Sequence, residues 1–527
     1  MRMHWVDEVA EELLRRGGKQ VIASGISISG HIHIGHSNDV FIADGVRRAV
    51  EERGGEAEAL WYADDFDPLR RVPWPLPPSY QRYLGMPYAN LPSPEEGFEN
   101  FVDYFSRGFL SSFKDFGLKL TVFFGSQVYR SGRMAPLIRL SLERAGEIRE
   151  ILNRYREKPL PEDWLPYDPL CENCGRISTT RAYDWSGPYV KYVCEGCSYV
   201  GGCGHEGKAD YTRGEGKLTW RVEWPARWKL LGVTCEPFGK DHAVRGGSYE
   251  TGKLIVERIF GGEAPYPIPY EWVSLRGERM SSSRGVVFTL SQWLSIAEPE
   301  LLRYFIFRSK AMKSKSFDPG LPLLDLYDEY DAVEELYFSG GEGGKREEQK
   351  ARIYELSQVE GVPERKPQRV PFRFAAVLSQ VVGGREERGM EILRERGFLV
   401  QPTEEDLERA RGRLRRAGNW VREYAPEWMR FRVLDSLPGE VRERLTEAQR
   451  GALSRLASDL RERDYDPVSL HNRVYELARE RGMDPPELFR AIYLVFLGRE
   501  AGPRVGNFLS AMERDFVVSR LTEASRA

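Results

Sequence analysis

The sequence predicts an α/β domain followed by an all-α C-terminal region. The first observation is a β–α–β pattern over residues 20–67, in which an apolar strand, a histidine-rich turn, a helix and a second strand follow one another. The second is a glycine-rich, charged segment over residues 339–350, which is typical of a linker. The third is that the chain beyond this segment has apolar residues at helical spacing and helix-capping patterns. A chain of 527 residues is long enough for roughly two to four domains.

The composition is typical of a soluble globular protein, with 41% hydrophobic and 30% charged residues. No apolar run approaches the roughly 20 residues that span a bilayer. Residues 1–18 predict an amphipathic helix, and its acidic residues are unlike a signal peptide. We therefore expect a cytoplasmic protein without a membrane partner. The net charge of −3 gives no overall attraction to nucleic acid, so RNA contacts would use local basic faces.

The β–α–β pattern begins with the apolar, β-branched run 20–24, which predicts a buried strand. A helix is expected over 38–53, where apolar residues recur at helical spacing and two glycines follow. The run 58–63 predicts the next parallel strand. Ligands of such sheets lie at the carboxyl ends of the strands, where this sequence has three aspartates. They predict either a ligand site or a polar loop that contains helix caps. These residues are Asp64, Asp65 and Asp67.

Three of the seven histidines lie in the segment 27–39, between the first strand and the helix. A helix N-terminus has unpaired N–H groups and a positive dipole, and it therefore suits phosphate. Gly35 lies between His33 and His36 and leaves room for a flat base near the backbone. Taken alone, these histidines are equally compatible with helix caps or surface residues.

The segments that follow predict a mixture of structures before the linker. Residues 73–94 are rich in proline and tyrosine and predict irregular structure, and residues 98–116 predict a helix with a core stripe of phenylalanines. A strand is expected near 122–125, and one long helix over 131–156.

Two Cys-x-x-Cys pairs separated by nineteen residues match a four-thiolate zinc ribbon. Structural zinc would hold together an insertion that has little core of its own. Cys203 and His205 follow closely, as a spare ligand pair or, in the favoured interpretation, a surface turn. The four predicted zinc ligands are Cys171, Cys174, Cys194 and Cys197.

Three further motifs contain residues that could bind a ligand or take part in a reaction. The run 218–228 (LTWRVEWPARW) predicts either the wall of a pocket or aromatic core packing. In the run 236–242 (EPFGKDH), Gly239 permits close backbone approach and Asp241 is a candidate for ribose hydroxyls. The run 278–285 (ERMSSSRG) is a basic serine-rich loop that follows an apolar strand, and alone it is also compatible with an ordinary solvated loop.

The histidine turn and the serine-rich loop, in this order, resemble the HIGH and KMSKS signatures of class I aminoacyl-tRNA synthetases. With the cysteine pairs and the helical tail, the chain resembles class I lysyl-tRNA synthetase, a form common in archaea and some bacteria. The resemblance implies a Rossmann-type catalytic domain over 1–295 with a connective zinc-binding insertion at about 98–217. It also implies a stem-contact region and linker over 296–345 and an α-helical anticodon-binding domain over 346–527.

The resemblance further implies ATP-dependent ligation of L-lysine to tRNA(Lys) through lysyl-adenylate, with Mg²⁺ in catalysis, structural Zn²⁺ and no DNA partner. Activation is expected to require bound tRNA. The implied catalytic residues are His33, His36, Arg279 and Ser281. The implied ATP-binding residues are Gly35, Asp39, Gly239, Asp241, Met280, Ser282 and Arg284. The implied lysine-binding residues are Gly25, Ser27, Asp65, Trp220, His242 and Tyr270, with Asp65 as the carboxylate for the ammonium.

Three departures from the family pattern stand out. Arg279 replaces the first lysine of KMSKS and keeps its charge with a different geometry. Ser282 replaces the second lysine and cannot neutralise pyrophosphate, so Arg284 is the proposed substitute. Relatives often have a metal site near positions 85–105, but that stretch has neither cysteine nor histidine here, and we expect no metal there.

Three alternative functions remain. A glutamyl-type synthetase shares the signatures, but its substrate carboxylate calls for arginine in the pocket. A small-molecule nucleotidylyltransferase shares the HxGH motif and has no use for the long helical tail. A non-catalytic, RNA-binding synthetase paralogue is favoured by the altered KMSKS sequence.

Overall fold

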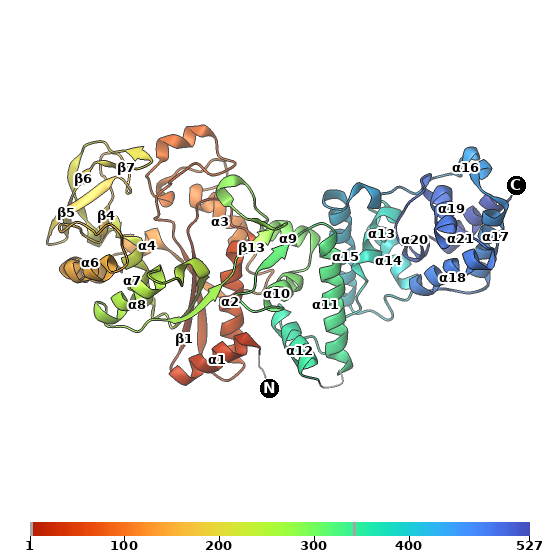
Figure 1. Cartoon of the computed structure of the whole chain (residues 1–527), viewed down its shortest axis with the longest axis horizontal. Helices are drawn as coiled ribbons and strands as arrows, with labels where there is room; N and C mark the ends of the chain where they lie inside the picture. The colour runs from red at the N-terminus through yellow and green to blue at the C-terminus, as the bar shows by residue number, and fades with distance from the viewer. Residues whose placement is uncertain (1–3, 341–343, 527) are drawn as a thin grey trace. The chain divides into compact units, whose positions relative to one another are not determined.

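A computed structural model describes residues 4–340 and 344–526 of the chain (Figure 1). The chain forms two compact units. The first contains the chain up to Gln292 together with Leu302–Phe317 and Glu348–Gly361. The predicted linker 339–350 includes residues 341–343, which lie outside the described residues. No described helix combines the length and the apolar character that a membrane crossing requires.

A five-stranded parallel sheet forms the centre of the first unit, in the order β12-β11-β1-β2-β3. The strands β1 and β2 pair along their whole lengths, from Gln20 opposite Ala57 to Ile26 opposite Ala63. The predicted β–α–β unit is therefore confirmed. The strands are β1 (Gln20–Ile26), β2 (Ala57–Ala63), β3 (Leu120–Phe124), β11 (Cys235–Gly239) and β12 (Tyr266–Tyr270).

The strand order reverses between β1 and β11. From β1 the chain proceeds to β2 and β3 on one side, and from β11 it proceeds to β12 on the other. Ligands of open parallel sheets bind in the crevice outside the carboxyl ends of the strands at such a reversal. The histidine turn follows β1, and the EPFGKDH run extends from β11 into the 3-10 turn Lys240–His242 at its carboxyl end, so both motifs lie at this crevice.

Helices α1 (Trp5–Arg16), α2 (Ile34–Glu51), α7 (Trp220–Leu231) and α8 (Ser248–Arg258) accompany the sheet. The helix α2 begins at Ile34, four residues before the predicted start. The reason is that the His33 side chain caps the helix, which the apolar spacing used for the prediction does not register. The fully buried Asp44 of α2 forms an ion pair with the equally buried Arg303 at 2.9 Å.

An insertion between β3 and β11 has its own small sheet, drawn in yellow in Figure 1. The predicted helix over 131–156 is two helices, because Arg144 leaves the helical conformation at φ −108°, ψ 20°. The helices are α4 (Gly125–Arg130), α5 (Ala135–Glu143) and α6 (Ala145–Asn153). The strands are β4 (Tyr167–Pro169), β5 (Thr180–Ser186), β6 (Tyr189–Cys194), β7 (Gly196–Cys197), β8 (Val200–Gly201), β9 (Glu206–Asp210) and β10 (Gly216–Leu218).

Residues 73–94 contain only the short 3-10 turns Pro78–Tyr83 and Tyr88–Asn90, as their composition predicts. The helix predicted over 98–116 is α3 (Phe101–Ser111), which Asn100 caps. Its phenylalanine stripe is buried, which confirms the prediction that these rings form core.

A three-stranded sheet precedes the serine-rich loop. Its strands are β13 (Val273–Leu275), β14 (Glu278–Arg279) and β15 (Lys315–Phe317). Arg276 and Gly277 form the β13–β14 turn with φ values of 53° and 81°. This hairpin carries the chain directly into the 3-10 turn Ser282–Arg284. The helices α9 (Leu290–Ile296) and α10 (Pro299–Phe307) follow, and α12 (Lys345–Ser357) also contributes to this unit.

The second unit is helical in its described residues and comprises Trp293–Leu301, Asp318–Glu347 and the chain from Val362. The helix-capping patterns that the sequence shows beyond the linker form two capping boxes, Thr403 with Asp406 and Thr446 with Gln449. Its helices are α11 (Leu321–Ser339), α13 (Phe372–Val382), α14 (Glu386–Glu395), α15 (Glu404–Glu423), α16 (Gly439–Arg444), α17 (Glu447–Glu462), α18 (Pro467–Glu480), α19 (Pro485–Leu497), α20 (Val505–Ser510) and α21 (Arg514–Ser525).

Candidate active site

Two stacked imidazoles form the N-terminus of α2. The rings of His33 and His36 lie 3.7 Å apart with an interplanar angle of 17°. The Nδ1 atom of His33 accepts a hydrogen bond from the backbone N–H of His36 at 3.3 Å. Because Nδ1 is the acceptor, a neutral His33 bears its proton on Nε2. Burial lowers the pKa of both histidines, and burial together with the charge of Arg279 lowers that of His36 to about 4. Both rings are therefore neutral at pH 7.

Several buried polar atoms beside this helix N-terminus have no hydrogen-bond partner among the described residues. They are Nε2 of His33, Nδ1 of His36, and both amide atoms of Asn38. Buried polar groups in folded proteins are nearly always paired. These atoms, at the positive end of the dipole of α2, are therefore suited to a polar ligand such as a nucleotide phosphate. Asn38 was not among the predicted site residues.

The serine-rich loop lies directly against the histidine turn. The hydroxyl of Ser282 donates a hydrogen bond to the carbonyl oxygen of His31 at 2.6 Å. The methyl group of Met280 lies 3.0 Å from the point where a side chain at Gly35 would begin, so glycine permits this approach. The two signature segments, which resemble HIGH and KMSKS, thus meet at one place.

Arg279 is exposed and lies over the indole ring of Trp272, 4.2 Å from its centre. A side chain at Gly239 would begin 3.1 Å from the same indole ring. The guanidinium of Arg279 therefore lies near both the end of β11 and His36. Arg284 and Asp241, which the sequence assigns to ATP, are both exposed.

An aromatic group surrounds His242 at the carboxyl end of β11. The ring of His242 lies 6.1 Å from Trp220 and 5.3 Å from Trp224. The buried Glu236 accepts hydrogen bonds from the indole N–H groups of Trp224, at 2.9 Å, and Trp228, at 2.5 Å. Glu236 thus holds the two tryptophans in place. A carboxylate within an otherwise apolar strand is the sequence signal that could have indicated this role.

The remaining residues assigned to lysine lie around the end of β1. A side chain at Gly25 would begin 3.1 Å from the carbonyl oxygen of Tyr62 and 3.9 Å from Nη2 of Arg227. The hydroxyl of Ser27 donates a hydrogen bond to Asp67. Tyr270 is buried, and its nearest charges are those of Asp39 and Glu236.

Asp65, the predicted carboxylate for the ammonium, is bound to another element. One oxygen accepts the backbone N–H of Ser126 at 2.7 Å, and the other accepts its hydroxyl at 2.5 Å. Ser126 is in the first turn of α4, so Asp65 acts as a partner of a helix N-terminus. The carboxylate at the end of β2 that contacts Ser27 is Asp67 instead. The sequence has three aspartates here, and nothing in it indicates which side chain points toward the proposed pocket.

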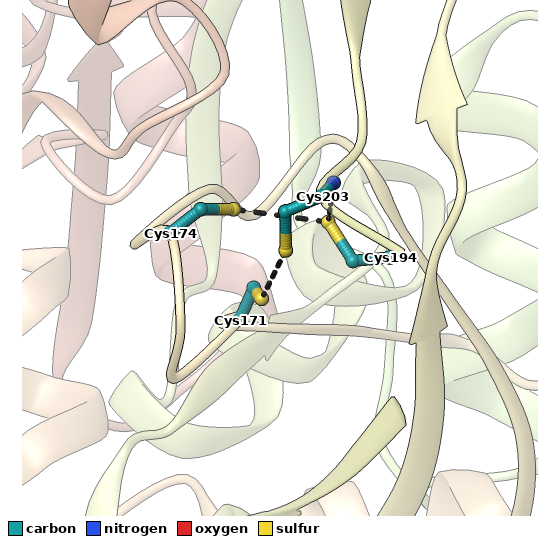
Figure 2. A group of neighbouring side chains, drawn as sticks. All are labelled: Cys171, Cys174, Cys194 and Cys203. Atoms are coloured by element: carbon teal, nitrogen blue, oxygen red, sulfur yellow. Dashed lines mark hydrogen bonds between the residues drawn. The ribbon is translucent and has the colours of Figure 1, made fainter. Parts of the chain in front are cut away.

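Four cysteine sulfurs of the insertion form one group, which Figure 2 shows. The sulfurs lie within 4.8 Å of one another, with Cys171 and Cys203 3.6 Å apart. Cys203 takes the place predicted for Cys197, because the β7–β8 hairpin turns the chain back and brings Cys203 beside Cys194. Cys197 instead contacts the Ser178 hydroxyl at 3.8 Å.

A parallel sheet with paired imidazoles at its switch point, met by a distant basic loop, is the arrangement expected of a class I tRNA synthetase. Residues 3–360 match the family described as tRNA synthetases class I (K). The chain belongs to this family, the class I lysyl-tRNA synthetases.

The similarity to curated relatives extends over the whole chain. It is 43% identical to the lysine–tRNA ligase of Methanosphaera stadtmanae, with 99% of each chain covered. It is 39% identical to that of Archaeoglobus fulgidus, with 99% of this chain and 100% of the relative covered. It is 38% identical to that of Methanocaldococcus jannaschii, with 98% and 99% covered.

Proposed function

We propose that the chain is a lysine–tRNA ligase that joins L-lysine to tRNA(Lys) through lysyl-adenylate, using ATP. The observation that carries the proposal is the meeting of the two signature segments, through Ser282 and His31, at the switch point of the sheet. Full-length similarity to lysine–tRNA ligases supports the choice of amino acid.

In the first step the lysine carboxylate attacks the α-phosphate of ATP, and pyrophosphate leaves. In the second step a hydroxyl of the terminal adenosine of tRNA takes the lysyl group, and AMP leaves. Neither step needs a strong protein base, because the carboxylate is already ionised at neutral pH. Catalysis therefore rests on positioning and on stabilising negative charge in the transition state.

The chain's own groups suit this task. The Nε2–H of His33 is buried and unpaired among the described residues, and it is available to donate to a phosphate oxygen. The N-terminus of α2 adds its positive dipole, and Arg279 adds a positive charge. Ser281 and Met280 belong to the same loop, and Gly35 leaves space beside it. Asp39, Gly239 and Asp241 are the proposed contacts to the nucleoside.

Ser282 uses its hydroxyl to join the loop to His31, so it is not the group that meets pyrophosphate. Arg284 lies in the same 3-10 turn, is exposed, and is the proposed cation for the leaving group. Mg²⁺ is bound largely by phosphates and water and so needs no dedicated protein cage. When bound with ATP, it neutralises phosphate charge.

For the amino acid we propose a pocket bordered by Gly25, Ser27, Trp220, His242 and Tyr270. The aromatic faces of this group suit a cationic side chain. The glutamyl alternative calls for a free arginine at this place. Arg227, the arginine nearest Gly25, is buried and already paired with Asp64 at 2.6 Å, which favours lysine.

We propose that Cys171, Cys174, Cys194 and Cys203 hold a structural zinc ion. Zinc–sulfur bonds of about 2.3 Å in a tetrahedron place the sulfurs about 3.8 Å apart. The separations of 3.6 Å, for Cys171 and Cys203, and 3.7 Å, for Cys174 and Cys194, fit this geometry. The ion would hold the insertion together, and four ligands leave no open position for catalysis.

We further propose that the helical unit binds the anticodon of tRNA and that residues 296–345 contact its stem.

The decisive experiment is aminoacylation of total tRNA with each of the twenty amino acids in turn. Charging with lysine alone supports the proposal, and charging with glutamate favours the glutamyl alternative. His33→Ala should reduce charging by a factor on the order of 10² or more. If the unaltered chain binds RNA but charges no tRNA, that result supports the non-catalytic paralogue. Brisk ATP–pyrophosphate exchange without tRNA contradicts the expected tRNA requirement.

A further inference from the structure

Trp272 and Arg279 meet on the hairpin that leads into the serine-rich loop. In this hairpin Ser274 of β13 pairs with Arg279 of β14. Trp272 lies two residues before Ser274, so the side chains of Trp272 and Arg279 are diagonal neighbours on one face of the strand pair. Aromatic and long side chains can reach each other across such a diagonal. The guanidinium of Arg279 accordingly lies 4.2 Å from the centre of the indole ring.

The indole ring of Trp272 is held against the carboxyl end of β11. A side chain at Gly239, the last residue of β11, would begin 3.1 Å from the ring, so the ring packs there on bare backbone. The backbone N–H of Trp272 donates a hydrogen bond to the Glu271 carboxylate at 2.9 Å. The other oxygen of that carboxylate accepts a hydrogen bond from the ammonium of Lys240, which follows Gly239, at 2.7 Å. Both the ring and the backbone of Trp272 are therefore tied to the end of the central sheet.

The guanidinium of Arg279 makes no hydrogen bond and no ion pair with any of the residues that the structure describes. Glu271, the neighbour of Trp272, is already paired with Lys240. An arginine can lie on an aromatic face and still present its planar set of N–H donors to a phosphate. The indole ring thus supports the guanidinium without neutralising its charge. That charge reaches the histidine turn, since it lowers the pKa of His36.

A lysine at position 279 would use the ring less well. Its ammonium is a compact, strongly hydrated point charge on a flexible stem, and it has no flat face to lay on an indole. Arg279 is exposed, so without a support its long side chain would sample many rotamers. A side chain that is ordered before the ligand arrives loses less entropy when the ligand binds. Trp272 therefore favours arginine at this position.

We propose that Trp272 is a positioning residue for the activation step, because its indole face holds the guanidinium of Arg279 where the phosphates of ATP are expected. Trp272 acts through Arg279 and meets no reacting atom itself. The inference rests on the proposed function, which places the phosphates at the histidine turn. It also gives a physical reason for the departure from the general KMSKS motif, since the partner of Trp272 must be a flat cation.

The test is a double-substitution cycle in the full-length enzyme, measured as lysine-dependent ATP–pyrophosphate exchange with tRNA present. Trp272→Leu removes the aromatic face, and Arg279→Lys keeps the charge and removes the flat guanidinium. Each alone should lower kcat about fivefold, the loss expected from one cation–π contact. In the Trp272→Leu background, Arg279→Lys should cost about twofold or less, because the contact is already absent. KM for lysine should stay unchanged throughout.

A conservative variant and two controls separate positioning from a general structural role. Trp272→Phe is also a smaller side chain, but it keeps an aromatic face and should retain about half of the exchange rate. Trp164→Leu replaces another partly exposed tryptophan, in the insertion, and should leave kcat unchanged. Arg276→Lys lies on the same hairpin, and its effect should be the same with and without Trp272→Leu.

The inference is overturned if Arg279→Lys lowers kcat by the same factor in both backgrounds, or if a folded Trp272→Leu enzyme keeps the kcat of the unaltered enzyme. It is also overturned if Trp272→Phe is as impaired as Trp272→Leu. If Trp272→Leu does not fold, the cycle is run with Trp272→Phe, and additive losses then overturn the inference.

Failure of the proposed function is a separate result, in which the unaltered enzyme shows neither exchange nor charging with lysine. The same cycle is then measured on the Kd for ATP. Non-additive losses of affinity support the pairing of Trp272 with Arg279, and additive losses overturn it.

Discussion

The hydroxyl of Ser282 donates a 2.6 Å hydrogen bond to the carbonyl oxygen of His31, and this bond joins positions 251 residues apart in the sequence. Ser282 is buried, so the bond is protected from water. Ser282 stands where the general KMSKS motif has its second lysine. It therefore contributes a contact that fixes the loop. We therefore propose that Arg279 and Arg284, on either side of Ser282, supply the positive charge for the phosphates.

Replacing Ser282 by alanine should loosen the loop. Losing one hydrogen bond of this kind costs roughly 1 kcal/mol, which corresponds to about a fivefold lower rate of ATP–pyrophosphate exchange. We expect the KM for ATP to rise as well, because this loop is part of the proposed ATP site. Ser283→Ala is the matched control, since the Ser283 hydroxyl contacts the Ser281 hydroxyl of the same loop, at 3.2 Å, and not the carbonyl oxygen of His31. Equal exchange rates for Ser282→Ala and the unaltered enzyme would show that the bond does not position the loop.

The histidine pair should make the exchange rate insensitive to pH between about 6 and 8. Burial lowers the pKa of His36 to about 4 and also lowers that of His33, so both rings stay neutral in this range. Protonation begins only as the pH falls toward 4. The measurement is the pH profile of kcat for exchange.

Arg279→Gln removes a positive charge that lowers the pKa of His36, so the acid limb of that profile should move to higher pH. Arg276→Gln, on the same hairpin and exposed, is the control and should leave the limb in place. An exchange rate that changes strongly between pH 6 and 8 in the unaltered enzyme would contradict neutral imidazoles.

The elements that the sequence predicts well are those defined by local pattern. Alternation of apolar strand, turn and helix predicts the β–α–β unit, and Thr403 and Thr446 cap the expected helices. The helix break at Arg144 has no proline to mark it, and the nearest glycine, Gly146, lies inside the second helix. At the site, residue types predict which segments matter, but the directions of Asp64, Asp65 and Asp67 depend on contacts with distant elements. For the same reason spacing favours Cys197, whereas a hairpin brings Cys203 to the sulfur group.

Zinc content should separate these two cysteines. Cys203→Ser should lower bound zinc from about one ion per chain and lower the Tm, because a structural site that loses a thiolate binds its ion more weakly. Cys197→Ser should retain the ion and the Tm, since Cys197 lies outside the group. Metal analysis of the purified proteins and thermal unfolding measure both. Loss of zinc from Cys197→Ser alone would restore the spacing-based assignment.

Two carboxyl groups, those of Asp64 and Asp168, should make the thermal stability of the enzyme depend on pH. Burial raises the pKa of Asp64 and Asp168 to about 7, above the ordinary value of 3.8. Between pH 4 and 7 the folded chain therefore binds more protons than the unfolded chain, and these two groups make stability fall as the pH rises through that window. The charges that face them are Arg227, Asp67, Glu223 and Lys217 for Asp64, and Lys217, Glu223, Asp67 and Arg70 for Asp168.

Asp64→Asn removes one of the two titrating groups and should flatten this dependence, because the amide has no proton to release in this range. The Tm is measured at half-unit steps from pH 5.5 to 8 for the unaltered enzyme and for Asp64→Asn. If the Tm of both proteins changes with pH to the same extent, Asp64 does not titrate in this range.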